Sequence, residues 1–155
     1  MVVNESYLWK KIKTLQKKQR LWHFTRIESA TIRGIADVNC LMNGFEFWIE
    51  LKGNVGKNLG LSDYQINWHY KHFKCGGFVF ILLPCVKDKV FKLFRLVGLG
   101  SCDHIPNHIP NHIPNHIPNH ITRDLNQEPI FQLIISNSSL EKLFLKLQNY
   151  FRSQL

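Results

Sequence analysis

The feature that most constrains this chain is an Asn-Gly pair, Asn43-Gly44, placed between two runs rich in β-branched and aromatic residues. Both residues tolerate positive φ, which the two-residue turn of a β-hairpin requires. The sequence therefore predicts a hairpin over residues 34–52. Counting outward from the turn gives its pairs, which are Met42 with Phe45, Cys40 with Phe47, Val38 with Ile49, and Asp37 with Glu50.

Strand alternation gives this hairpin two unlike faces. On one face Asp37 lies opposite Glu50, with Lys52 two residues further along. Like charges that face each other roughly 5 Å apart on a sheet repel. One ammonium group is a poor match for two carboxylates, and a divalent cation held by oxygen ligands fits better. The other face is apolar and suited to packing on helices, with Val38, Cys40, Phe47, Ile49 and Leu51.

These residues carry a resemblance to a known family. Asp37, followed after twelve residues by Glu50-Leu51-Lys52, resembles the signature of the PD-(D/E)XK nuclease superfamily. Arg26-Ile27-Glu28 before it, and Ser62-x-x-Gln65-x-x-Trp68-His69 after it, are similar to small phage-type members related to Holliday junction resolvases. The similarity covers roughly residues 22–83.

One position departs from the family pattern, because Ala36 stands where a proline usually precedes the first aspartate. That proline is not a ligand in the family, so the chemistry implied by the resemblance is unaffected. The resemblance implies a restriction-endonuclease-like core, with the acidic face at one end of its sheet.

The resemblance also implies a metal site for Mg²⁺, with Mn²⁺ able to substitute. Asp37 and Glu50 would hold the ion, with the Leu51 carbonyl as a third oxygen and Glu28 as a ligand directly or through water. Lys52 would position or deprotonate the attacking water, or stabilise charge on the phosphate, and the sequence leaves these roles open. Gln65 is given a place near this site.

Composition bounds the partner. The chain has 155 residues, 45% of them hydrophobic, which is enough for one globular domain with a real core. Its formal net charge is +9, from 20 Lys and Arg against 11 Asp and Glu, which favours a polyanion such as nucleic acid over a membrane surface. The four cysteines show no metal-ligand spacing. Without a signal peptide or a transmembrane run, we expect a cytoplasmic protein of a bacterial or phage-infected cell.

Helical periodicity opens the chain. Apolar residues recur at Leu8, Ile12 and Leu15 in a predicted amphipathic helix from Asn4 to about Trp22. Its outer face is basic and either contacts phosphates or is simply solvated. A loop rich in glycine follows the hairpin over residues 53–60 and also offers a lysine. The candidate phosphate contacts are Lys10, Lys13, Lys17 and Lys57.

A second helix is predicted to begin at Ser62, because Ser62-x-x-Gln65 matches a capping box, and to stop at Gly76-Gly77. Gln65 could thus cap its own helix, serve the site, or do both. His69 is either a satisfied surface residue or a contact near the scissile phosphate, and Trp68 is expected to pack on the sheet.

The second half of the chain looks structural. Strands are predicted at 78–83, 90–97 and 129–135, and Ser138-x-x-Glu141 is a capping box for a closing helix. Four His-Ile-Pro-Asn copies within 103–122 exclude an α-helix, since proline recurs at every fourth position. We interpret them as a low-complexity loop, with metal binding as the alternative.

Together these elements predict a single α/β or α+β domain over residues 1–155, with a mixed central sheet flanked by helices. The expected function is a Mg²⁺-dependent DNA endonuclease, either structure-specific and junction-resolving or sequence-specific and homing-type, acting as a homodimer. The alternatives are a catalytically inactive DNA-binding module on a nuclease fold, and a metal-binding protein acting through the histidine repeat.

Overall fold

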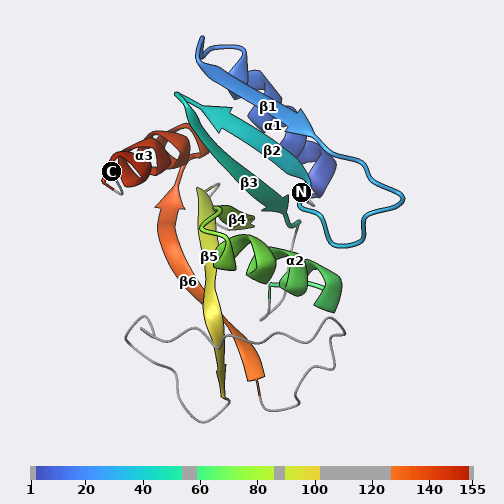
Figure 1. Cartoon of the computed structure of the whole chain (residues 1–155). Helices are drawn as coiled ribbons and strands as arrows, with labels where there is room; N and C mark the ends of the chain where they lie inside the picture. Colours follow the sequence, from blue (N-terminus) through green and yellow to red (C-terminus); the bar gives the residue numbers. More distant parts are fainter. Residues whose placement is uncertain (1–2, 54–58, 86–89, 102–126, 154–155) are drawn as a thin grey trace.

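The computed structural model describes residues 3–53, 59–85, 90–101 and 127–153, which form a single α+β domain with one mixed sheet (Figure 1). The predicted repeat at 103–122 and Lys57 lie outside the described residues. The elements in chain order are α1 (Glu5–Gln16), β1 (Trp22–Arg26), β2 (Val38–Met42), β3 (Phe45–Leu51), α2 (Asp63–Lys74), β4 (Val79–Cys85), β5 (Val90–Ser101), β6 (Gln127–Ser138) and α3 (Leu140–Arg152).

The strands lie in the sheet in the order in which they occur in the chain, from β1 to β6. Neighbouring strands are antiparallel except for β3 and β4, which are parallel. A parallel pair needs a crossover connection, and α2 supplies it. The predicted mixed sheet flanked by helices is therefore confirmed.

The β2–β3 hairpin has the predicted register. Asn43 and Gly44 have φ of 51° and 86°, the positive values that their turn demands. Asp37 directly precedes the first residue of β2. The predicted pairs found in the structure are Met42 with Phe45, Cys40 with Phe47, and Val38 with Ile49.

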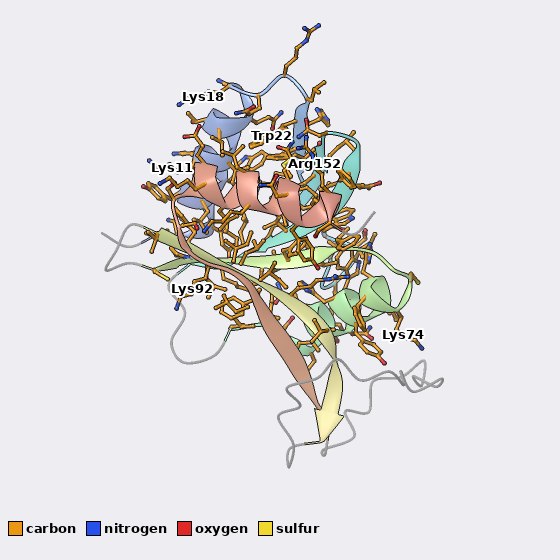
Figure 2. The ribbon with its side chains drawn as sticks, turned by 90° about the vertical axis from the view of Figure 1, so that its left-hand side faces the viewer. Lys11, Lys18, Trp22, Lys74, Lys92 and Arg152 are labelled. Atoms are coloured by element: carbon orange, nitrogen blue, oxygen red, sulfur yellow. The ribbon has the colours of Figure 1, made fainter. Side chains whose placement is uncertain are left out.

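Helices α1 and α3 cover one face of the sheet, where the main core lies. The amphipathic stripe of α1 is buried as predicted, and Trp22 of β1 packs against Phe144 of α3 with ring centroids 5.5 Å apart (Figure 2). The five residues of the predicted apolar hairpin face are all fully buried in this core, namely Val38, Cys40, Phe47, Ile49 and Leu51.

Helix α2 covers the opposite face. Its capping box is present as predicted, with the Ser62 and Gln65 side chains each bonded to the other residue's backbone N–H. The helix ends before Gly76, whose φ of 78° suits the left-handed turn that commonly follows a helix. Among the described helices, none is both long and apolar enough to cross a bilayer.

Two sequence predictions need correction. The first helix ends at Gln16 rather than near Trp22, and residues 22–26 instead form β1 at the edge of the sheet. The cap of α3 is Ser139, whose Oγ accepts from the Lys142 N–H, while Ser138 closes β6 and its Oγ accepts from Lys146 Nζ at 2.8 Å. In both places a strand occupies residues that the local pattern assigned to a helix or its cap.

Candidate active site at the end of β3

The structure brings four predicted site residues together where β3 ends. Asp37 enters from the residue before β2, Glu50 and Lys52 come from the end of β3, and Gln65 comes from the first turn of α2. Asp37 is held by its neighbours on both sides. Its Oδ2 accepts from the Leu51 N–H at 2.7 Å, and its carbonyl accepts from the Ile27 N–H at 2.7 Å.

Gln65 joins Glu50 and Lys52. Its Nε2 donates to Glu50 Oε1, and its Oε1 accepts from Lys52 Nζ at 3.2 Å. The same Oε1 also accepts from the Ser62 N–H at 3.0 Å, which is the capping contact. Lys52 Nζ lies 3.0 Å from Glu50 Oε1. Capping and site geometry, the two roles open for Gln65, are thus carried by a single amide.

The carboxylate of Glu50 is buried, with 1% of its side chain exposed. Burial, followed by the nearby charge of Asp37, raises the pKa of Glu50 to about 7, against the smaller opposing effect of Lys52. Burial also raises the pKa of Asp37, although its hydrogen bond to Leu51 acts in the other direction. The two acids therefore repel each other as the hairpin register predicted. The single ammonium group of Lys52 does not offset this repulsion.

Glu50 Oε2 is buried and has no hydrogen-bond partner among the described residues. A buried anionic oxygen without a partner is costly, and a bound cation is one way to satisfy it. Among the described residues, no group of three or more His, Cys, Asp or Glu side chains could hold a metal ion. The donors that fit a hard cation are thus the two carboxylates of Asp37 and Glu50, completed by backbone oxygen and water.

Glu5, in the first turn of α1, is a contributor that sequence analysis missed. Its charge raises the pKa of both Asp37 and Glu50, so Glu5 lies close enough to act on both acids. The preceding Asn4 caps α1 by accepting from the Tyr7 N–H at 2.8 Å. The N-terminal ends of α1 and α2 are therefore both close to the site. A first-turn Glu after an Asn cap was visible in the sequence, but its proximity to Asp37 depends on tertiary packing.

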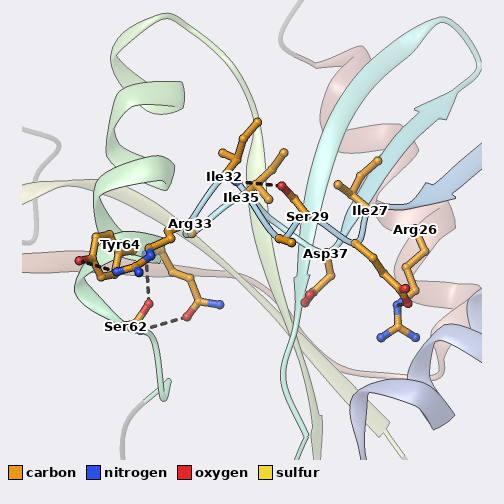
Figure 3. A pocket seen from close by; sticks show the side chains of 13 residues that line it. Arg26, Ile27, Ser29, Ile32, Arg33, Ile35, Asp37, Ser62 and Tyr64 are labelled. Carbon is orange, nitrogen blue, oxygen red and sulfur yellow. Dashed lines mark hydrogen bonds and ion pairs between the residues drawn. The ribbon is translucent and has the colours of Figure 1, made fainter.

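Glu28 lies near the site, but its carboxylate is paired with Arg26. Its side chain is 80% exposed and forms an ion pair with Arg26, whose Nε is 3.5 Å from Glu28 Oε1. It lines an open cavity of about 690 Å³ together with Asp37 and Gln65. Figure 3 shows Arg33 and Tyr64 on one side of this cavity and Arg26 on the other, with Asp37 between them.

The remaining predicted contacts differ in exposure. His69 is 1% exposed, and both of its ring nitrogens lack a hydrogen-bond partner among the described residues. Burial, followed by the charges of His72 and Lys52, lowers the pKa of His69 to about 3. The expectation of a surface residue is therefore wrong, because the His69 ring is buried, and its contact with a phosphate stays a prediction. Lys10 and Lys13 of α1 and Lys17, which caps its C-terminal end, are exposed as a nucleic-acid contact requires.

No family model, no curated protein and no solved structure matches the chain.

Proposed function

We propose that this protein is a Mg²⁺-dependent DNA endonuclease whose active site is the cluster at the end of β3, on a restriction-endonuclease-like core. The observation that carries the proposal is the arrangement around Glu50. One carboxylate oxygen is engaged by Gln65 and Lys52, and the other is buried without a described partner, in the presence of a second acid. The net charge of +9 supplies the attraction for a polyanion.

Asp37 and Glu50 would hold the metal, with the Leu51 carbonyl as a further oxygen donor. When bound, Mg²⁺ or Mn²⁺ lowers the pKa of a water and neutralises charge on the phosphate oxygens. The backbone N–H of Leu51 fixes Asp37 Oδ2 and thus orients the carboxylate before substrate arrives. Such preorganisation is what makes electrostatic catalysis efficient.

Lys52 has three N–H donors, and its described contacts use two of them, on Glu50 and Gln65. The third donor is left for the attacking water or a phosphate oxygen. Gln65 Oε1 helps to hold the Lys52 ammonium group in place. This supports a role for Lys52 in positioning water and stabilising charge at the phosphate.

Two active sites are needed to cut both strands of a duplex, so the proposal includes a homodimer, the commonest closed assembly. The exposed lysines of α1 would contact the DNA backbone at a distance from the cut. Figure 2 shows Lys11 on α1 and Lys18 just after the end of this helix, so the basic surface continues past α1.

The test is to incubate the purified protein with supercoiled plasmid, linear duplex, a four-way junction and single strands in Mg²⁺, Mn²⁺ or Ca²⁺. We expect cleavage of at least one DNA form in Mg²⁺ and Mn²⁺, and binding without cleavage in Ca²⁺. Absence of cleavage with every DNA form, alongside retained binding, would instead support an inactive DNA-binding module.

The variants Glu50→Ala and Lys52→Ala should abolish cleavage. Glu46→Ala is the matched control, because Glu46 lies on β3 four residues before Glu50, is exposed, and accepts only from Asn39 Nδ2 at 3.0 Å in the described contacts. Cleavage that survives both site variants would refute the assignment of the site.

A further inference from the structure

The cavity beside the candidate active site, here called the loop cavity, is bounded by the loop of residues 27–35 and by the first turn of α2. Asp37 and Gln65 form part of its wall, so the loop cavity and the proposed metal site share side chains. Its volume of about 690 Å³ lies in the range of small-molecule sites. A ligand in the loop cavity would therefore lie next to the proposed metal site.

The rim of the loop cavity carries flat and apolar groups in positions open to solvent. Tyr64 is 51% exposed and Ile32 is 54% exposed. The guanidinium carbon of Arg33 lies 5.4 Å from the centre of the Tyr64 ring, and its Nη1 donates to the Tyr64 hydroxyl at 3.3 Å. Exposed aromatic rings paired with arginine planes are typical of sites that stack nucleic-acid bases.

A positive charge stands on the other side of the loop cavity. Arg26 uses Nε for its ion pair with Glu28, and its side chain is 27% exposed. Its remaining N–H groups form the planar fork that suits a phosphate. The loop cavity therefore offers stacking at one wall and phosphate binding at the other, which is the chemistry of a nucleotide.

The walls are held in place before any ligand binds. Gly34 has φ of 82°, and a Cβ atom there would lie 2.3 Å from the backbone of Tyr64. The Ile32 N–H donates to Ser29 Oγ at 2.9 Å, which shapes the loop. Close backbone contact with α2 fixes the loop relative to the Tyr64 ring, so the loop cavity is preformed.

We propose that the loop cavity receives an unpaired DNA nucleotide next to the scissile phosphate, with its base stacked on Tyr64 and its phosphate bound by Arg26. This rests on the proposed endonuclease function and narrows its substrate class. A base paired within a duplex has both faces covered by its neighbours, and extruding it costs free energy. The protein should therefore prefer DNA with an unpaired nucleotide at the cut site over the same sequence fully paired.

The experiment measures binding in Ca²⁺ by fluorescence anisotropy, with a duplex containing one unpaired nucleotide and its fully paired counterpart. Base stacking on an aromatic side chain corresponds to about tenfold in affinity, so we expect about a tenfold preference for the unpaired form. Tyr64→Ala should remove that preference, and Tyr64→Phe should keep it. Leu41→Ala is the control, because Leu41 is 43% exposed on β2 and does not line the loop cavity.

A 2-aminopurine base at the unpaired position gives a second readout, since stacking on Tyr64 quenches its fluorescence. Equal affinity for the two DNA forms, or a preference that Tyr64→Ala leaves unchanged, overturns the inference even if the protein cleaves DNA in Mg²⁺. A Tyr64-dependent preference without any cleavage supports the loop cavity and refutes the proposed endonuclease function. The two proposals are thus tested separately.

Discussion

Two consecutive residues of β3, Ile49 and Glu50, are buried on opposite faces of the sheet, one among apolar side chains and one among polar side chains. Ile49 is fully buried among the apolar side chains contributed by α1 and α3, and Glu50 is buried to the same degree beneath α2. Ile49 contributes to stability simply by leaving water. Glu50 gains nothing from burial and requires Gln65, Lys52 and a positive partner to offset its desolvation.

Two neighbouring residues of β3 are thus buried equally, and under the proposed function they have different roles. The face under α1 and α3 holds the domain together, and many substitutions there would leave the chemistry intact. The face under α2 holds two acids that repel each other, and a bound cation would offset their charge. Perturbed carboxyl pKa values in a partly enclosed site are a common mark of function.

The largest effect should come from Glu50→Gln, which breaks the contrast on the polar side. Removing the charge eliminates a proposed metal ligand while keeping the shape and the bond from Gln65, so cleavage in Mg²⁺ should fall by about 10³-fold. The measurement is the initial rate of plasmid cleavage, with circular dichroism to verify folding. A folded variant that cuts at the normal rate would contradict the proposed site.

The neighbouring change, Ile49→Ala, should do the reverse. Loss of a fully buried side chain and the cavity it leaves should lower the free energy of unfolding by about 2–5 kcal/mol. Urea denaturation measures this loss, and the cleavage rate per folded molecule should stay within about twofold. If Ile49→Ala instead impaired cleavage while leaving the urea midpoint unchanged, the division of β3 into two roles would be wrong.

The pH dependence of stability sharpens the comparison. The pKa of Glu50 is raised from 4.5 to about 7, so its contribution to the free energy of unfolding falls as pH rises through this window, by on the order of 3 kcal/mol. His69, with a pKa lowered from 6.5 to about 3, contributes in the opposite direction up to pH 6.5. The two contributions oppose each other in the wild-type protein between pH 4.5 and 6.5.

The effect of Glu50 is isolated by comparing the wild-type protein with Glu50→Gln in EDTA. The free energy of unfolding of the variant, relative to the wild type, should increase between pH 4.5 and 7 and then level off. Adding Mg²⁺ at pH 8 should stabilise the wild type more than the variant, because the ion takes the place of the proton. A constant difference across this pH range would argue against a raised pKa.

The smallest effects are expected from alanine substitutions at two glycines, Gly34 and Gly44, that have similar backbone conformation. Gly34 and Gly44 have φ of 82° and 86°, and alanine at Gly44 should cost about 1 kcal/mol through strain, with a larger loss at Gly34 because of its close backbone contact. Only at Gly34 would the new Cβ meet the backbone of α2, whereas at Gly44 nothing lies within 4 Å. Gly34→Ala should therefore also slow cleavage, by moving the loop next to Asp37, and Gly44→Ala should not. Equal cleavage by the two variants would show that the loop is not coupled to the site.

Sequence analysis succeeded where local chemistry dictates geometry. The Asn43-Gly44 turn fixed the register of β2 and β3, and from that register followed the apolar face and the approach of Asp37 to Glu50. The capping box at Ser62 located the start of α2. Because alternation along a strand is strict, one correct turn assigns every side chain of the hairpin to a face.

What failed depended on packing between distant segments. Residues 22–26 alternate Trp and Phe with polar residues, which is a strand pattern, but the predicted helix extends to about Trp22 and no strand is predicted directly after it. The burial of Glu50 and of His69 could not be predicted, because alternation indicates the face of a sheet and not what covers it. The proximity of Glu5 to Asp37 likewise arises only when α1 packs on the sheet.

The amide of Gln65 has a wider consequence. Since the same oxygen closes the first turn of α2 and holds the ammonium group of Lys52, fraying of that turn and disarray of the reactive groups are one event. Slow hydrogen exchange at the start of α2 would then indicate that the proposed site is ordered, and a ligand that orders Lys52 should also slow exchange in this helix turn. The order of this helix turn and the order of the proposed site therefore depend on the same side chain, Gln65.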